Sequence, residues 1–183
     1  MNVLLLPGMH GSSALFGPLL RHLDPSLQPT PISFPADVAL GYDELLETRH
    51  PQQITALVLA ATFARCPRAI AAKMLATVGP LLFRAQIPRL AIRWALIGMD
   101  AAAVDVEAVR AEILAVSPAV MARRLREIVA VDTRAEFSAL KTPTLYLAGN
   151  RDRLVSGSVM KELRELRPDM AVKVLSSPHL ILQ

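Results

Sequence analysis

The chain has 183 residues and a mass of 19.9 kDa, which suits one domain over residues 1–183 and leaves little room for two. Hydrophobic residues make up 52% and charged residues 20%, so the composition excludes a disordered chain and supplies a sizeable core. Cys66 is the one cysteine, which excludes an internal disulfide framework and a cysteine-based zinc site.

The net charge of +4 comes from one region of the sequence. No acidic residue lies between Glu47 and Asp100, and that stretch holds seven basic residues: Arg49, Arg65, Arg68, Lys73, Arg84, Arg89 and Arg93. Such a stretch is typical of a solvated face; the alternative is a docking surface for an acidic carrier protein or for anionic lipid. No aromatic-studded surface or reader motif accompanies it, so we expect no binding of nucleic acid.

The N-terminal residues enter the apolar run 3–6 directly, without a basic region or a cleavage site, so we expect no signal peptide. The apolar run 74–83 is interrupted by Gly79 and Pro80 and has about half of the ~20 residues that a membrane span needs. The sequence therefore predicts a cytoplasmic protein with no membrane span.

Short apolar segments alternate with segments of helical periodicity, which predicts an α/β fold with a largely parallel sheet. Five segments are predicted strands: 3–6, 31–35, 54–61, 144–148 and 171–175. Three segments outside the middle of the chain are predicted helices: 15–23, 42–49 and 159–166. Residues 66–138 are rich in Ala, Leu and Arg and contain a helix start at Ser117-Pro118, so we expect a helical insertion there.

Three segments carry residues that suit catalysis, and each follows the end of a predicted strand. Residues 6–11 form a glycine-rich turn before a helix, residues 148–155 contain Asp152, and residues 177–179 end in His179. The carboxyl ends of parallel strands meet at one edge of an open sheet, which is where such sheets place their sites. We therefore expect Asp152 and His179 to lie face to face beside the first glycine turn.

The order of these motifs resembles that of the α/β-hydrolase superfamily: a glycine turn, a helical insertion, Gly149-x-x-Asp152-x-Leu-Val and a final histidine. The insertion at 66–138 is similar to the helical lid of small carboxylesterases, including the pimeloyl-carrier-protein methyl esterase type. The resemblance implies that Asp152 is the catalytic acid and His179 the catalytic base. It also implies that the backbone amide of Met9 is an oxyanion-hole donor.

One part of the family pattern is absent from this chain. No Gly-x-Ser-x-Gly nucleophile elbow occurs in the sequence, and the place where it would fall, near 47–50, has no room for a strand, a turn and a helix. Closing that gap predicts a doubly wound sheet of order 2-1-3-4-5, with apolar surface left exposed and self-association as a consequence. The nucleophile stays unassigned, because no such turn surrounds any of five candidate serines: Ser12, Ser13, Ser33, Ser156 and Ser158.

Each candidate residue also has a structural interpretation. Asp152 can form a turn or cap a helix, and His179 can be a solvated loop residue. The glycine turn can bind an anion at a helix N-terminus, with Ser12 and Ser13 as donors. His10 has no second ligand at a suitable spacing, and the turn lacks both Gly-x-Gly-x-x-Gly and a P-loop lysine, so the sequence predicts neither a metal nor a nucleotide cofactor.

Two functions from different classes follow. The first is hydrolysis of a small carboxylic ester or thioester with an apolar acyl group, impaired because the serine is absent. A His–Asp pair without that serine can still orient a water molecule, but most of the acceleration is lost. The second is a non-catalytic binding or assembly module that kept the scaffold. A third explanation is that the gap comes from the gene model, from the expressed sequence or from a truncated natural gene, and none of the three requires a cofactor.

Overall fold

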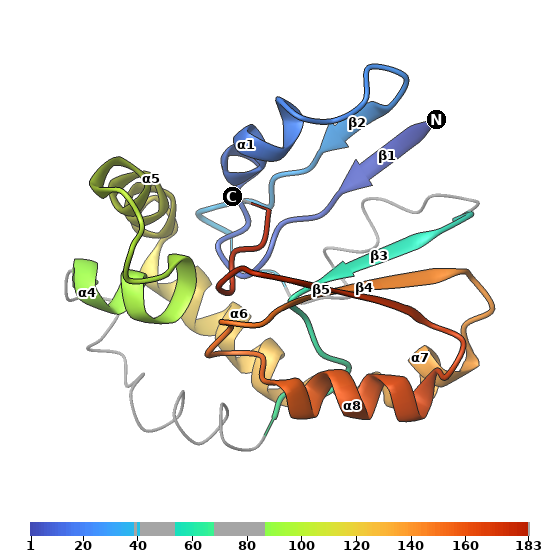
Figure 1. The fold of residues 1–183 in the computed structure, drawn as a ribbon. Coiled ribbons are helices and arrows are strands. Elements are labelled where there is room, and N and C mark those ends of the chain that lie inside the picture. The colour runs from blue at the N-terminus through green and yellow to red at the C-terminus, as the bar shows by residue number, and fades with distance from the viewer. Residues whose placement is uncertain (39, 41–53, 68–86, 183) are drawn as a thin grey trace.

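The computed structural model describes residues 1–38, 40, 54–67 and 87–182, so the predicted helix at 42–49 and the apolar run 74–83 lie outside the described residues. Parallel strands form the centre, and their carboxyl ends point toward the side where α4 and α5 lie (Figure 1). The strands are β1 (Asn2–Leu5), β2 (Gln28–Pro31), β3 (Leu57–Ala60), β4 (Thr144–Gly149) and β5 (Ala171–Leu175). The helices are η1 (Ala14–Phe16), α1 (Gly17–Leu20), α4 (Arg89–Ile92), η2 (Arg93–Ile97), α5 (Ala103–Leu114), α6 (Pro118–Ala130), α7 (Arg134–Ala139) and α8 (Gly157–Leu166).

The first sheet consists of β1 and β2, with Val3 beside Pro29 and Leu5 beside Pro31. The second strand was predicted at 31–35, and the structure corrects this to Gln28–Pro31. The reason lies in the proline spacing: Gln28 and Ile32 donate amide hydrogen bonds to β1, whereas the alternate positions are the prolines, which have no amide hydrogen to donate. Prolines are therefore tolerated here, because their backbone nitrogens point to the outer edge of the strand pair, where no hydrogen bond to β1 is needed.

The second sheet has the order β3-β4-β5, and α7 and α8 pack on one of its faces (Figure 1). Its core cluster contains Tyr146 from β4 and Leu163 from α8, each only 1% exposed. The hydroxyl of Tyr146 donates a hydrogen bond to the carbonyl oxygen of Thr62 at 3.0 Å, which satisfies its polar group inside the core. Burial, and then the charge of Asp152, raise the pKa of Tyr146 to about 12.

The five strands do not form the predicted single sheet of order 2-1-3-4-5. Within the described residues β1 and β3 are not hydrogen-bonded to each other, and the strands form two sheets, β1-β2 and β3-β4-β5. Leu4 and Val58, on the two strands that the prediction pairs, are 40% and 58% exposed, so a face of each strand is incompletely covered. Each strand is already paired on its other edge, and Arg124 of α6 is hydrogen-bonded to the segments that follow β1 and β2.

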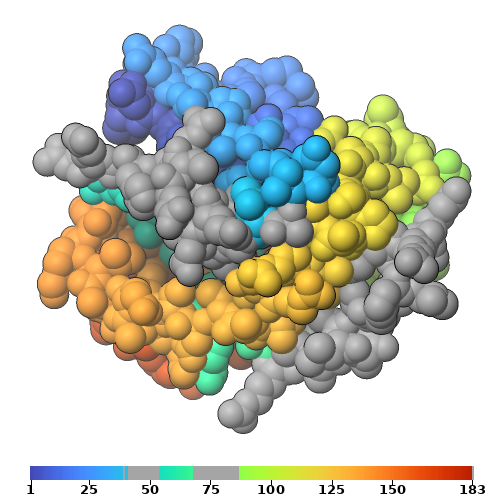
Figure 2. Space-filling model, turned by 180° about the vertical axis from the view of Figure 1, so that it is seen from behind, coloured from blue at the N-terminus to red at the C-terminus, as the bar shows by residue number. Residues whose placement is uncertain are grey.

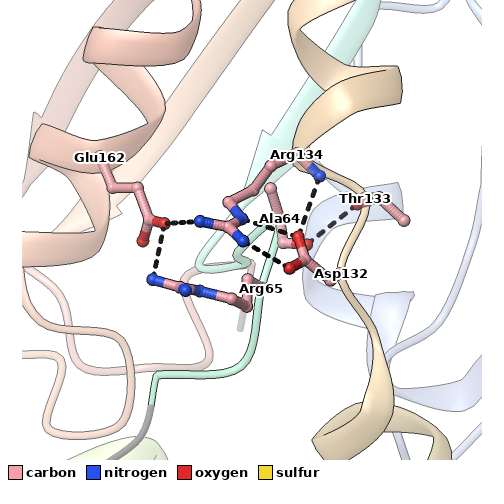
Figure 3. Close-up of polar contacts among 6 residues, drawn as sticks. All are labelled: Ala64, Arg65, Asp132, Thr133, Arg134 and Glu162. Carbon is pink, nitrogen blue, oxygen red and sulfur yellow. Dashed lines mark hydrogen bonds and ion pairs between the residues drawn. The ribbon is translucent and has the colours of Figure 1, made fainter.

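The described residues of the proposed insertion, 66–138, form helices α4, η2, α5, α6 and most of α7, and the two ends of the insertion lie side by side. Arg65 and Asp132 form an isolated antiparallel bridge, and both the amide and the hydroxyl of Thr133 donate to the carbonyl oxygen of Ala64. Ion pairs surround this pairing: Glu162 of α8 lies 3.2 Å from Arg65, and Arg134 binds both carboxylate oxygens of Asp132 (Figure 3). We call the paired segments 64–66 and 131–133 the stem of the insertion.

Helices α5 and α6 lie against the N-terminal part of the chain (Figure 2). The amide of Ser117, just before α6, donates to the carbonyl oxygen of Ala36 at 2.9 Å. The Ser117-Pro118 helix start is confirmed, since the Ser117 hydroxyl caps α6 by accepting from the amide of Val120. No helix in the described part of the chain is long and apolar enough to cross a bilayer.

Candidate active site

Asp152 lies just beyond the carboxyl end of β4, and its side chain is only 1% exposed. One carboxylate oxygen, Oδ1, accepts hydrogen bonds from the amides of Leu154 and Val155 at 2.8 and 2.9 Å. Its own amide donates to the carbonyl oxygen of Gly149 at 3.2 Å. This turn fixes the carboxylate and leaves the second oxygen, Oδ2, available for another partner.

That partner is His179, which follows β5. Its Nδ1 lies 2.9 Å from Oδ2 of Asp152, so the two sequence-predicted residues are in hydrogen-bond contact. Because the carboxylate can only accept, the bond holds the proton of a neutral imidazole on Nδ1 and leaves the lone pair on Nε2. Within the described residues Nε2 has no hydrogen-bond partner, and the side chain is 22% exposed.

Gly149 lets the segment that carries His179 pass close to the end of β4. A side-chain carbon at this position would lie 2.5 Å from the carbonyl oxygen of Ser177 and 2.7 Å from that of Pro178. The amides of Asn150 and Arg151 bind the carbonyl oxygens of Leu175 and Ser177, which ties the two segments together. The absence of a side chain at Gly149 is therefore a condition for the Asp152–His179 contact.

The glycine turn after β1 is closed by a hydrogen bond from the amide of Gly11 to the carbonyl oxygen of Gly8 at 2.9 Å. Gly11 has a φ of +76°, a left-handed conformation that favours glycine. The side chain of Met9 packs against the cluster of Val116, Val120 and Met121, the last two of which lie in α6. In the described part of the chain, no group accepts a hydrogen bond from the Met9 amide, so this donor is available to a ligand.

Arg124 of α6 is the residue at this site that sequence reasoning missed. It is 7% exposed, and its guanidinium donates to the carbonyl oxygens of Met9, His10 and Pro35 at 3.1, 2.8 and 2.7 Å. It also lies over the ring of Phe34, 5.9 Å from the centroid. Burial lowers the pKa of Arg124. The sequence signal was its position three and four residues from Met121 and Val120, on the apolar face of the predicted helix.

His10 is held inside the same turn. Its Nε2 donates to the carbonyl oxygen of Ser12 at 3.1 Å, and burial lowers its pKa. The serines near the turn are also engaged: Ser13 and Ser33 are hydrogen-bonded through their hydroxyl groups at 2.8 Å. None of the five candidate serines is hydrogen-bonded to His179, whose bonded side-chain partner in the described residues is Asp152.

The glycine turn and the His179 segment converge on one hydrophobic cluster. Leu15, which follows the turn, and Leu180, which follows His179, both belong to the cluster around Ile92 and Val106 of the insertion. The amide of Leu180 also donates to the carbonyl oxygen of Leu96 at 2.9 Å. The structure therefore brings the carboxyl ends of β1, β4 and β5 to the same side of the molecule, with helices of the insertion beside them (Figure 1).

Several solved structures are similar to this chain. An enol-lactonase from Burkholderia xenovorans LB400 matches with 16% sequence identity and a TM-score of 0.72, over 98% of this chain and 84% of that one. A carboxylesterase structure from the Thaumarchaeon Nitrososphaera gargenis matches with 13% identity and a TM-score of 0.76, over 99% and 83%. An esterase from Exiguobacterium antarcticum matches with 11% identity and a TM-score of 0.75, over 98% and 85%.

The chain has the fold of the α/β-hydrolases. This confirms the fold class that the order of motifs predicts, and it extends over nearly the whole chain. No family model and no curated protein sequence matches the chain. Within this α/β-hydrolase fold, the predicted place of the absent nucleophile elbow, near 47–50, lies outside the described residues.

Proposed function

We propose that this protein is a cytoplasmic hydrolase of small carboxylic esters or thioesters with an apolar acyl group, in which water takes the place of the absent serine. The observation that carries the proposal is the 2.9 Å contact between His179 and the buried carboxylate of Asp152. A carboxylate that fixes the tautomer of a histidine is the arrangement that general-base catalysis requires. The lack of a Gly-x-Ser-x-Gly turn in the sequence makes the reaction slow.

The proposed reaction uses the free lone pair on Nε2 of His179. Nε2 takes a proton from a water molecule while the water oxygen bonds to the carbonyl carbon of the ester. The tetrahedral intermediate then expels the alcohol or thiol as the C–O or C–S bond breaks. Nε2 returns its proton to this leaving group, which yields a carboxylic acid and leaves the enzyme unchanged. Asp152 holds the ring and stabilises the imidazolium form during the transfer.

The glycine turn supplies the second element of the proposed site. The unpaired amide of Met9 is the donor for the oxygen on which negative charge develops in the intermediate. The apolar cluster of Leu15, Ile92 and Leu180 next to His179 favours an apolar acyl group, and the insertion acts as its lid. The enol-lactonase and the carboxylesterase among the similar structures support an ester or lactone as substrate.

Hydrolysis of p-nitrophenyl butyrate by the purified full chain tests the proposal. We expect Asp152→Asn and His179→Ala each to lower the rate about 100-fold, because each removes general-base assistance. The matched control is His22→Ala, which replaces an exposed histidine in the turn after α1 and leaves the rate unchanged. A wild-type rate equal to that of both site variants contradicts the proposal, since the variants are purified in the same way and carry the same trace esterases.

The second candidate function is a non-catalytic binding module, and the absent serine motif is the observation that favours it. Trp94 is the one tryptophan of the chain, and it lies in η2, which contacts Leu180 through Leu96. Its fluorescence therefore reports on an apolar ligand near His179. Saturable quenching by butyryl thioester with no release of thiol favours the binding module, whereas turnover of the same thioester ends this alternative.

A further inference from the structure

Arg124 is a buried cation with no carboxylate partner among the described residues. Its hydrogen bonds go to three carbonyl oxygens, those of Met9 and His10 in the glycine turn and that of Pro35 after β2. A buried charge of this kind is costly unless its donors are used well, and the planar fork of guanidinium is the side chain that can bind three acceptors at once. The arrangement therefore links α6 of the insertion to the segments after β1 and β2. It does so with a buried charge, which costs more free energy than an apolar contact would.

The Met9 amide is oriented by a chain of contacts that ends at Arg124. The peptide group between Gly8 and Met9 is held on its oxygen side, because Gly8 accepts the hydrogen bond from Gly11. The peptide group that supplies the Gly11 amide is held in turn by Arg124, which binds the carbonyl oxygen of His10. A trans peptide is planar, and its N–H points opposite to its C=O, so the Met9 amide must point away from the closed turn.

The space around the turn adds a second constraint. A side-chain carbon at Gly11 would collide with the guanidinium of Arg124, so the turn and the cation are in direct contact. The side chain of Met9 is meanwhile packed on the cluster of Val116, Val120 and Met121 at the start of α6. Helix α6 thus holds the backbone of Met9 from one side and its side chain from another.

We propose that Arg124 is the positioning residue of this site: its guanidinium binds the carbonyl oxygens of Met9 and His10, fixes the peptide group whose Gly11 amide binds Gly8, and so orients the Met9 amide, before any ligand arrives, toward the oxygen of a reacting carbonyl. This inference rests on the proposed function for its catalytic purpose. It assigns to the insertion a second role besides covering the acyl group. The positive charge beside the turn also favours negative charge on an oxygen bound there.

Kinetics of Arg124→Ala, with Arg126→Ala as the matched control, give the first test. Arg126 is exposed and lies on the same helix, so its removal takes away equal charge without touching the turn. We expect Arg124→Ala to lower kcat for p-nitrophenyl butyrate about 100-fold with little change in KM, as loss of an oriented oxyanion donor does. Arg124→Lys restores only part of the rate, because a lysine cannot bind all three carbonyl oxygens.

Chemical rescue separates positioning from general loss of folding. Guanidinium ion added to Arg124→Ala at a concentration below that which unfolds the protein is expected to restore kcat, and the same concentration of sodium chloride is not. A kcat that falls equally in Arg124→Ala and Arg126→Ala, or a change confined to KM, overturns the proposal. So does a variant that remains folded by circular dichroism, loses activity and gains nothing from guanidinium.

Amide hydrogen exchange tests the positioning without any activity. We expect the Gly11 amide, which closes the turn onto Gly8, to exchange faster in Arg124→Ala than in the wild type and to slow again when guanidinium is added. A wild-type protein without esterase activity overturns the proposed function, and the exchange rates then decide the positioning on their own. Unchanged exchange at Gly11 in Arg124→Ala overturns the positioning even if the wild type is an active esterase.

Discussion

The two sheets of the molecule hold their parts of the site by different means. In the β3-β4-β5 sheet, Asp152 is fixed by backbone amides and His179 by a segment tied to β4 through backbone hydrogen bonds. In the β1-β2 sheet, the turn that carries Met9 is closed by the Gly11 amide and is held in addition by the side chain of Arg124, which reaches it from α6. The Asp152–His179 contact is therefore a local product of the strand ends, whereas the proposed oxyanion turn also depends on a helix more than 100 residues away in the sequence.

The difference extends to how each sheet is covered. The β3-β4-β5 sheet has a continuous core in which Tyr146, Val159 and Leu163 are each at most 2% exposed. On the β1-β2 side, Leu4 and Leu6 are 40% and 54% exposed. Burial of apolar area is the main source of stability, so the β3-β4-β5 half should be the more stable of the two, and substitutions there should have larger effects.

The largest effect is expected at Gly149. Gly149→Ala places a carbon against the carbonyl oxygens of Ser177 and Pro178, so the free energy of unfolding should fall by about 3 kcal/mol as the backbone shifts. The measurement is urea unfolding, with Gly157→Ala as control, since a side chain there meets nothing within 4 Å. Equal stability of the two variants would show that the His179 segment is not tightly packed against β4. It would contradict the view that backbone contacts in the β3-β4-β5 sheet hold this segment.

A somewhat smaller effect is expected from the buried hydroxyl of Tyr146. Its folded-state pKa of about 12 lies above the ordinary value of 10.0, so the stability it contributes is fully present below pH 10 and is lost as the pH rises toward 12. The loss should be about 2 kcal/mol, and Tyr146→Phe should not show it. Urea unfolding of both proteins on either side of pH 10 checks this; parallel pH curves would show that this core is open to solvent.

The smallest effect is expected at the start of α6, on the side of the weaker sheet. Ser117→Ala removes the cap that accepts from the Val120 amide and should lower the free energy of unfolding by about 1 kcal/mol. Ser138→Ala, at an exposed hydroxyl within α7, is the control. If α6 holds the glycine turn, exchange at Gly11 should also rise in Ser117→Ala; a loss of stability with no change at Gly11 would mean that the turn does not depend on this helix.

Much of the β3-β4-β5 half could be predicted because its signals are local. The strand expected at 171–175 is observed at those residues, and that expected at 144–148 extends one residue further, to Gly149. The contact between Asp152 and His179 also follows from local order, because both residues lie just after parallel strands that are neighbours in the sheet. Their catalytic roles remain predictions that the kinetic experiments decide.

The β1-β2 half could not be predicted as well, since its structure depends on contacts between distant segments. The strand near 31–35 was displaced because the direction in which each proline faces is decided by its partner strand, not by its own sequence. Arg124 stands among the three arginines Arg123, Arg124 and Arg126, and nothing in that local charge pattern distinguishes the buried one. The separation of β1 from β3 likewise depends on contacts across both sheets. The spacing along the chain permits the two strands to pair but does not require it.

The stem of the insertion has a consequence for how this chain can change in evolution. Because Arg65 and Asp132 pair directly, the distance between the end of β3 and the start of α7 is set at the stem and not by the length of what lies between. The entropy of closing a loop grows only slowly with its length, so segments can be gained, lost or exchanged beyond the stem with little effect on the strands beneath. The stem thus makes the insertion an exchangeable module, whose sequence can diversify while the geometry of Asp152 and His179 is inherited intact.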